Sequence, residues 1–225
     1  MEAEGAARQF GALRLLEQGV RIMDPANCYA GPQVKVGEGT VLLPGTILRG
    51  GTVIGKNCEI GPNAMIRDCT VGESVTINAS QLNESTVDDG ATVGPFAYVR
   101  PNCHVGAKVK VGDFVELKNS TIGAGTKISH LTYVGDSDVG ERVNFGCGTV
   151  TVNYDGTQKY RTTIGDDAFI GCNTNLVAPV KVGDGAYTAA GSTITDEVPA
   201  DSLAIARARQ TVKKQWAAKR RARKR

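Results

Sequence analysis

The sequence predicts an all-β domain in which six-residue repeats form a parallel β-helix. Aliphatic side chains recur at about every sixth position from Val36 to Ile194, and glycine follows many of them. A period of six fits neither an amphipathic helix nor an alternating strand, but it is typical of hexapeptide β-helices. Aromatic residues make up only 5% of the chain, so the core has to be built from Val, Ile and Leu supplied many times over.

The repeat is interrupted once. It continues to about Phe145, and the segment NYDGTQKYRT at residues 153–162 then separates it from Ile164, where it resumes. Three six-residue sides make one coil, so the span from Val36 to Ile194 predicts roughly nine coils. At a spacing of about 4.8 Å they form a prism on the order of 40 Å long. We expect the interrupting segment to be a loop that folds over bound ligands.

Helices are expected at both ends of the repeat. Near the N-terminus, apolar residues at helical spacing predict a helix over residues 2–19. These residues are Phe10, Leu13, Leu16 and Val20. At the other end, Asp201 or Ser202 can cap a helix that runs from Leu203 to about Arg221.

These features divide the chain into three parts, over residues 1–20, 21–199 and 200–225. The first part is a helix that we interpret as the remnant of an interdomain linker. The second is the β-helix, which no internal boundary divides. The third is a helix with a basic tail.

Charge is concentrated at the C-terminus. The chain has 26 basic and 23 acidic residues, a net charge of +3, and residues 213–225 contain eight of the basic residues and no acid. The rest of the chain therefore has 18 basic and 23 acidic residues, a net charge of −5. A basic tail can contact nucleic acid or anionic lipid. We interpret it as a solvated terminus and expect no nucleic acid and no membrane as partners.

The cysteines and the hydropathy indicate a cytoplasmic protein. Six cysteines are scattered without a CxxC pair, and no apolar signal segment precedes the repeat. Reduced thiols are therefore a better interpretation than disulfides. No apolar run approaches the ~20 residues that a membrane-spanning helix requires.

His130 is the leading candidate for a general base, because imidazole accepts protons near neutral pH. A positioned general base is worth roughly 10² to 10⁴ in rate. The alternative is a histidine packed at a corner of the prism. The second histidine, His104, lies in the turn PNCHVG and is expected to be an exposed corner residue. Two separated histidines without clustered cysteines do not match a catalytic zinc site, so we expect no metal.

Three basic residues, Arg100, Lys118 and Lys159, are the nearest in register to His130. Arg100 and Lys118 are 18 positions apart, about one coil, so they should project from the same side of the prism, and Lys159 lies in the interrupting segment. Such a cluster can hold a phosphate, with the arginine as a bidentate fork and the lysine as a point charge. Ordinary surface charge is the alternative interpretation.

Six segments resemble a known family in their order and spacing. They are GPFAYVRP (94–101), GDFVELK (112–118), HLTYVGD (130–136), NFGCGTVTVNYDG (144–156), FIGCNTNLVAPV (169–180) and LAIARARQ (203–210). Together they resemble the C-terminal acetyltransferase half of the bacterial bifunctional GlmU family, in the hexapeptide-repeat acyltransferase superfamily. The resemblance covers essentially the whole chain from about Gly19.

The resemblance implies a left-handed β-helix, an exception to the usual right-handed crossover. It implies a homotrimer with active sites between neighbouring prisms. It also implies acetyl transfer from acetyl-CoA to the amine of glucosamine 1-phosphate, a step toward the cell-envelope precursor UDP-N-acetylglucosamine. The uridyltransferase domain of the family is missing from this sequence, so we expect no uridylylation.

The resemblance also assigns roles to single residues. His130 matches the family's catalytic base. Residues matching the sugar-phosphate site are Arg100, Lys118, Tyr133 and Asn144, with Lys159 in the loop that closes on it. Residues matching acetyl-CoA contacts are Asn153, Tyr154, Ala190 and Arg207, together with Cys147 and Cys172. Other members carry Ala and Ser at the two cysteine positions, and a thiol replaces the Ser hydroxyl only as a weak donor.

Two alternatives to this function stay open from the sequence. One is a trimeric binding module that keeps the motifs without turnover. The other is an acetyltransferase for a different amino sugar.

Overall fold

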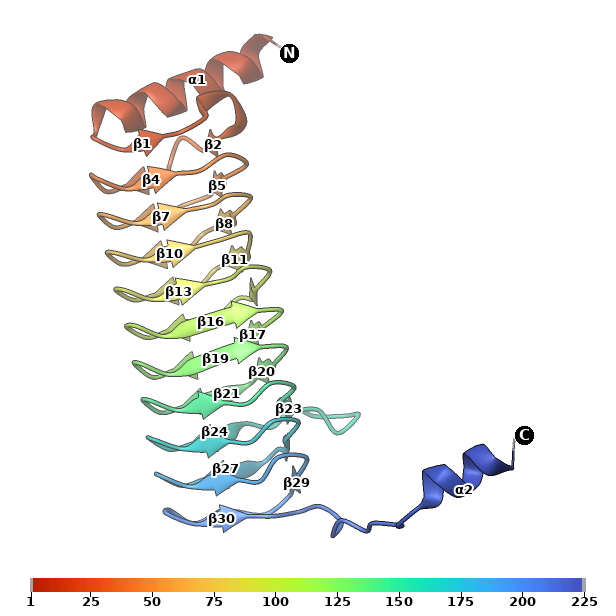
Figure 1. The fold of residues 1–225 in the computed structure, drawn as a ribbon. Coiled ribbons are helices and arrows are strands. Elements are labelled where there is room, and N and C mark those ends of the chain that lie inside the picture. Colours follow the sequence, from red (N-terminus) through yellow and green to blue (C-terminus); the bar gives the residue numbers. More distant parts are fainter. Residues whose placement is uncertain (1, 224–225) are drawn as a thin grey trace.

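The computed structural model describes residues 2–223 and contains three parallel sheets that form the sides of a prism (Figure 1). Strands three places apart along the chain pair in parallel, except that β28 pairs with β30, so the three sheets grow together coil by coil. The coils wind in a left-handed sense, with the N-terminus at one end of the prism and the C-terminus at the other (Figure 1). The predicted fold class is confirmed.

The strands are only two to four residues long. Sheet A contains β1 (Arg21–Ile22), β4 (Val41–Leu42), β7 (Glu59–Ile60), β10 (Thr76–Ile77), β13 (Thr92–Val93), β16 (Lys110–Asp113), β19 (Lys127–His130), β22 (Asn144–Phe145), β25 (Phe169–Ile170), β28 (Tyr187–Thr188) and β30 (Leu203–Ala204). Sheet B contains β2 (Tyr29–Ala30), β5 (Ile47–Arg49), β8 (Met65–Arg67), β11 (Gln81–Asn83), β14 (Tyr98–Val99), β17 (Glu116–Lys118), β20 (Tyr133–Gly135), β23 (Val150–Val152), β26 (Asn175–Val177) and β29 (Thr193–Ile194). Sheet C contains β3 (Lys35–Val36), β6 (Val53–Ile54), β9 (Thr70–Val71), β12 (Thr86–Val87), β15 (His104–Val105), β18 (Thr121–Ile122), β21 (Ser137–Val139), β24 (Thr162–Ile164) and β27 (Val180–Val182).

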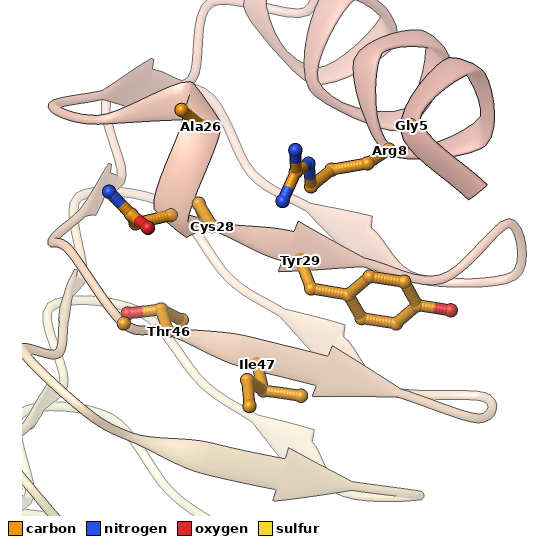
Figure 2. A pocket seen from close by; sticks show the side chains of 9 residues that line it. Gly5, Arg8, Ala26, Cys28, Tyr29, Thr46 and Ile47 are labelled. Atoms are coloured by element: carbon orange, nitrogen blue, oxygen red, sulfur yellow. The ribbon is translucent and has the colours of Figure 1, made fainter. Parts of the chain in front are cut away.

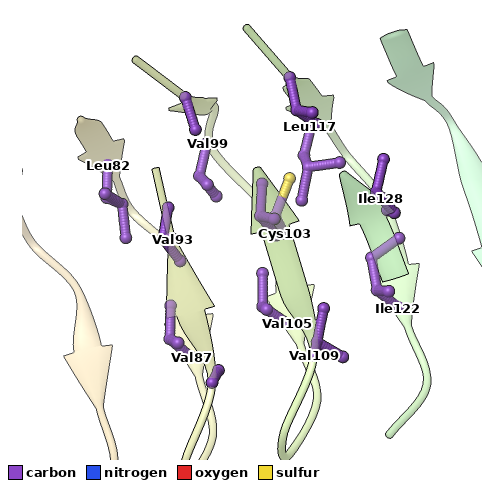
Figure 3. Close-up of a cluster of buried hydrophobic side chains, with 14 of the residues drawn as sticks. Leu82, Val87, Val93, Val99, Cys103, Val105, Val109, Leu117, Ile122 and Ile128 are labelled. Carbon is purple, nitrogen blue, oxygen red and sulfur yellow. The ribbon is translucent and has the colours of Figure 1, made fainter. Parts of the chain in front are cut away.

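The core is one continuous stack of the aliphatic residues that define the repeat. Val99, for example, lies opposite Leu82 in the coil before it and Leu117 in the coil after it, and all three are fully buried (Figure 3). Each inward side chain is therefore covered by its equivalents in the adjacent coils, and Phe145 is the one aromatic residue among the buried core side chains of residues 2–223.

The prism is longer than predicted. Its ten strands in sheet B correspond to about ten coils, where the spacing predicted roughly nine. The difference arises because β1 and β2 extend the ladder before Val36, and β30 extends it beyond Ile194. These end strands contain few of the aliphatic residues on which the prediction rested.

The six-residue repeat also continues closer to the interrupting loop than predicted. Thr151 lies six residues after Phe145, is buried, and stands opposite Leu176. Its hydroxyl is satisfied by the backbone of Gly135, with hydrogen bonds of 2.7 and 3.1 Å. A search for aliphatic residues misses this position, because a threonine takes it. The next inward residue is Ile164, seven residues later than the period requires, which gives the length of the inserted loop.

The N-terminal helix α1 (Glu2–Glu17) covers the first coil of the prism (Figure 1). Its buried face consists of Ala12 and Leu15, whereas Phe10, Leu13 and Leu16 are exposed. The helix was predicted, but its predicted apolar face was wrong. The reason is close packing at Gly11, where a Cβ atom would lie 2.8 Å from the carbonyl oxygen of Ala30 and so would keep the helix away from the prism.

The predicted C-terminal helix is largely wrong. Leu203 and Ala204 form β30, which pairs with β28 and completes sheet A, and the helix α2 (Trp216–Ala222) begins 13 residues later than expected. The exposed edge of β28 explains the difference. The amide of Tyr187 donates to the carbonyl of Ser202 at 2.8 Å, so pairing here satisfies backbone groups that a helix at residue 203 would leave open.

Candidate functional site

A row of side chains follows the corner where sheet A passes into sheet B. In the pairing of β16 with β19, Asp113 lies opposite His130. The register of the next three strand pairs puts Cys147, Cys172 and Ala190 at the same position in successive coils. We call these five residues the corner ridge. It brings together four of the residues assigned from the sequence, and it adds Asp113.

The backbone at this corner explains why the side chains line up. The residue after each of the four later ridge positions adopts a positive φ, with 45° at Leu131, 76° at Gly148, 54° at Asn173 and 72° at Gly191. A left-handed residue at this place makes a tight turn between consecutive strands. The same turn in each coil presents the preceding side chain at the same point of the corner.

His130 is held by Asp113 through one nitrogen of its ring. Nδ1 of His130 lies 2.6 Å from Oδ1 of Asp113. A carboxylate can only accept, so Nδ1 carries the proton in the neutral ring and Nε2 keeps a free lone pair. The hydrogen bond from His130 holds the pKa of Asp113 below its ordinary value. The exposed imidazole is thus oriented with a proton acceptor directed away from its partner.

Arg100 and Lys118 stand one coil apart at the far edge of sheet B, as their spacing predicted. Their neighbours Val99 and Leu117 are paired, and the amide of Arg100 donates to the carbonyl of Leu117 at 2.9 Å. The guanidinium of Arg100 donates to Oε1 of Glu116 at 2.9 Å. This leaves further N–H groups of the arginine for a ligand.

A buried carboxylate holds Lys118. Oδ2 of Asp136 accepts from Nζ of Lys118 at 2.9 Å, and Oδ1 accepts from the side chain of Asn119 at 2.6 Å. The amide of Asn153 donates to the same carboxylate. Burial raises the pKa of Asp136, but the bonds from Asn119, Lys118 and Asn153 outweigh it and hold that pKa below its ordinary value. Only 7% of the Asp136 side chain and 18% of the Lys118 side chain are exposed.

The inserted loop forms a short hairpin beside β23 that projects from the prism (Figure 1). Tyr154 and Lys159 form an antiparallel bridge across it. At its tip, the carboxylate of Asp155 accepts from the amides of Gln158 and Thr157 at 2.7 Å each, which lowers the pKa of Asp155 to about 2. The turn at the tip of the hairpin is therefore held by hydrogen bonds within the loop itself.

Arg161 fixes the base of this hairpin to the coil before it. Its guanidinium forms a bidentate pair with Asp138, at 2.8 and 2.5 Å, and donates to the carbonyl of Asn119 at 3.2 Å. Asn153 at the start of the hairpin lies 3.4 Å from the hydroxyl of Tyr133. The loop residues are thus brought to the side of sheet B that carries Tyr133 and Lys118.

Two assigned residues lie apart from this cluster. Asn144 is the first residue of β22 and stands opposite Lys127 and Phe169 on the outer face of sheet A, not on sheet B. Arg207 follows β30, and its Cδ is 3.8 Å from the place where a Cβ of Gly191 would be. Arg207 therefore lies beside the turn residue that follows Ala190, next to the end of the ridge.

Asp113 and Asp136 are the site residues that the sequence reasoning missed. Asp113 precedes His130 by 17 residues, and Asp136 follows Lys118 by 18, so both are one coil from their partners. The repeat alone could have found them, had each candidate been compared with the residues one coil away.

The pocket in Figure 2 lies elsewhere, between α1 and the first coils. It has a volume of about 500 Å³, and its lining includes Arg8, Cys28 and Tyr29. None of the assigned site residues lines it. Within residues 2–223, no group of three or more His, Cys, Asp or Glu side chains is arranged to hold a metal ion. No helix in that range is long and apolar enough to cross a membrane.

Comparison with known proteins supports the repeat and the resemblance. Residues 33–68 and 161–196 match the bacterial transferase hexapeptide family, described as six repeats. The chain is 60% identical over 201 residues to the bifunctional protein GlmU of Clostridium perfringens, which covers 89% of this chain and 44% of that protein. It is 51% identical over 211 residues to the GlmU of Staphylococcus haemolyticus, covering 94% of this chain and 47% of that protein. The chain thus spans somewhat less than half the length of these relatives.

A solved structure supports the fold. The UDP-N-acetylglucosamine acyltransferase of Francisella novicida superposes with a TM-score of 0.53 at 17% identity, over 82% of this chain and 66% of that one. At this identity the likeness concerns the fold alone. The resemblance noted from the sequence is confirmed: the chain is a homologue of one part of the bifunctional GlmU proteins, built on the bacterial transferase hexapeptide repeat.

Proposed function

We propose that the chain transfers acetyl from acetyl-CoA to the amine of glucosamine 1-phosphate, as the C-terminal acetyltransferase part of a GlmU-type protein. The observation that carries the proposal is the oriented His130, whose Nδ1 is bonded to Asp113 while its Nε2 is free beside the corner ridge. The identity of 51 to 60% to GlmU relatives over about nine tenths of the chain supports this choice of substrates.

The reaction forms one C–N bond and breaks one C–S bond. The amine attacks the thioester carbonyl, and Nε2 of His130 accepts the proton that the amine loses. Coenzyme A leaves as a thiolate and takes up a proton. Asp113 keeps the imidazole in the tautomer that can accept a proton, and its charge stabilises the imidazolium that forms.

The sugar phosphate binds along sheet B in this proposal. Arg100 and Lys118 supply the positive charge for the phosphate, because each retains N–H groups beyond the one bonded to a carboxylate. Tyr133 lies between this pair and the hairpin, and Lys159 closes on the sugar phosphate from the hairpin. Fixing the phosphate orients the amine toward His130, which converts binding energy into proximity.

Acetyl-CoA lies along the corner ridge on the other side of His130. Cys147, Cys172 and Ala190 follow His130 in successive coils, and Arg207 supplies a positive charge beyond the last of them. Asn153 and Tyr154 contact the coenzyme from the hairpin. This arrangement puts the thioester at the His130 end of the ridge, next to the acceptor amine.

A homotrimer would complete the site. Asn144 lies on sheet A and Lys118 on sheet B, and in this proposal the Asn144 that meets the ligand comes from a neighbouring prism. Exposed apolar residues beside the ridge supply a contact surface, because Phe96, Phe114 and Leu131 are all exposed and the two phenyl rings stack at 5.5 Å. Exposed apolar side chains grouped in this way are typical of protein interfaces. The expected trimer is measurable by sedimentation equilibrium.

The test is acetyl transfer itself. Release of the coenzyme A thiol is measured with acetyl-CoA and glucosamine 1-phosphate, and other amino sugars are compared as acceptors in parallel. We expect glucosamine 1-phosphate to be the best acceptor. Binding of acetyl-CoA without thiol release would contradict the proposal and favour a non-catalytic module, and faster release with another amino sugar would correct the substrate.

A further inference from the structure

The six cysteines fall into two groups of different reactivity. Four of them are buried in the core: Cys28, Cys58, Cys69 and Cys103. Burial raises the pKa of all four thiols, to about 11 for Cys28 and for Cys69. They therefore form little of the reactive thiolate. Cys147 is half-buried and Cys172 is exposed, so these two are the accessible thiols.

The register of the coils brings the two accessible thiols together, although they are 25 residues apart in the sequence. The pairing of β22 with β25 places Cys147 directly opposite Cys172, and the amide of Asn173 donates to the carbonyl of Cys147 at 2.8 Å. Paired strands lie about 4.8 Å apart, within the range of about 4.4 to 6.8 Å between the Cα atoms of a disulfide. Adjacent coils can thus be joined here with only small movements.

We propose that Cys147 and Cys172 form a reversible disulfide by exchange with a small-molecule disulfide, and that this bond blocks acetyl transfer. The formation of the bond depends only on the two thiols. Its effect on the reaction rests on the proposed function, in which both residues contact acetyl-CoA.

The exchange proceeds in two balanced steps. The more exposed thiolate, Cys172, attacks one sulfur of the small disulfide, which forms a mixed disulfide and releases one thiol. Cys147 then attacks the sulfur of Cys172, which releases the second thiol and leaves the Cys147–Cys172 bond. The protein loses two electrons and two protons, and the small disulfide is reduced to two thiols. His130, one coil before Cys147 on the ridge, is placed to accept the proton of that thiol.

The bond would change the ridge where the coenzyme lies. It ties two successive coils at their corner, removes both S–H groups and draws the two side chains toward each other. Since the ridge between His130 and Ala190 consists only of these two residues, a change there displaces the coenzyme along its whole contact with the corner.

The test is peptide mapping of the full chain after treatment with oxidised glutathione and removal of the reagent. Trypsin cleaves after Arg142, Lys159, Arg161 and Lys181, so Cys147 and Cys172 fall in separate peptides that each contain one cysteine. We expect a joined pair of these peptides under non-reducing conditions, and we expect dithiothreitol to separate it. In parallel, formation of acetylated sugar is measured by mass, with loss of the activity on oxidation and recovery after reduction.

Two variants and a matched control make the result decisive. Cys147→Ala and Cys172→Ser are each compared with their own reduced form, and both should resist oxidative inactivation. Cys103→Ala removes a buried thiol and should still form the bond. Three outcomes would overturn the proposal. The first is a bond that joins other cysteines or two chains, and the second is glutathione left on Cys172 without a joined peptide. The third is inactivation of Cys172→Ser to the same extent as the wild type. A chain that forms the bond but transfers no acetyl in its reduced form would instead refute the proposed function.

Discussion

Two histidine–aspartate pairs lie on the surface of the prism, and they differ in the ring nitrogen that the carboxylate binds. Asp88 contacts His104 through Nε2 at 2.8 Å, whereas Asp113 contacts His130 through Nδ1 at 2.6 Å. The two imidazole side chains are similarly exposed, at 49% and 57%. Exposure and a carboxylate partner therefore do not distinguish a base. The remaining difference is the nitrogen left free, which is Nε2 in His130 and Nδ1 in His104.

The surroundings of the two pairs differ as well. His104 stands between Thr86 and Thr121 on sheet C, whereas His130 lies on the corner ridge, which continues from it into two thiols. The candidate phosphate-binding residue Lys118 lies on the sheet that follows His130 in the chain. The molecule thus contains its own control, a second histidine pair on the same scaffold without the neighbours assigned to the proposed reaction.

Removal of each imidazole tests the comparison most strongly. We expect His130→Ala to lower kcat for acetyl transfer by roughly 10² to 10⁴, since the general base is lost. His104→Ala should leave the rate unchanged. The measurement is thiol release at saturating acetyl-CoA, with circular dichroism to verify that both variants fold. Equal rates for the two variants would remove the distinction between the pairs.

Removal of the two carboxylates, Asp113 and Asp88, should give a smaller difference in kcat in the same direction. Asp113→Ala should lower kcat by less than the ~10² to 10⁴ expected for His130, because the base remains but its ring is no longer oriented. Asp113→Asn retains an oxygen that can accept from Nδ1, so it should recover part of the loss. Asp88→Ala is the matched control and should not affect kcat. If the asparagine variant is no better than the alanine variant, orientation by Asp113 is not its role.

A third carboxylate extends the comparison from exposed pairs to a buried one. Asp136→Ala leaves Lys118 and two side-chain amides without their shared acceptor, so we expect a loss of about 1–3 kcal/mol in the free energy of unfolding. Asp88→Ala breaks an exposed pair and should cost about 0–1 kcal/mol. Urea unfolding followed by circular dichroism measures both. Similar losses would mean that the burial of Asp136 has no energetic consequence.

The pH dependence of stability should show the smallest effect. The pKa of Asp136 is lower in the folded chain than its ordinary value. Its ionised form therefore stabilises the fold fully above the ordinary pKa of about 4, and this contribution is lost as the pH falls through the lower folded value. The difference in unfolding free energy between the wild type and Asp136→Asn should shrink as the pH is lowered below about 4. A constant difference would contradict the depressed pKa.

Much of the fold followed from the sequence, because the repeat is local and periodic. The period and the extent of the inward positions, from Val36 to Ile194, were predicted because mostly aliphatic side chains recur at about every sixth position. The inward position of Thr151 was not predicted, because its side chain is polar. The strand β30 was not predicted, because Leu203 and Ala204 pair only when the edge of β28 is present. The face of α1 was misjudged because Gly11 permits a closer contact than larger apolar residues allow.

By itself, the sequence determined the hexapeptide prism, the position of its one long loop and the choice of His130 as the candidate base. The tertiary structure decided which atoms meet: the nitrogen of each histidine that is bonded, the burial of Asp136 and the pairing of Cys147 with Cys172. The physical reason is the length of the coil, which varies along the chain. Partners one coil apart are separated by 16 residues at His104, 17 at His130, 18 at Lys118 and 25 across the loop, so contacts between coils depend on every slip and insertion between them.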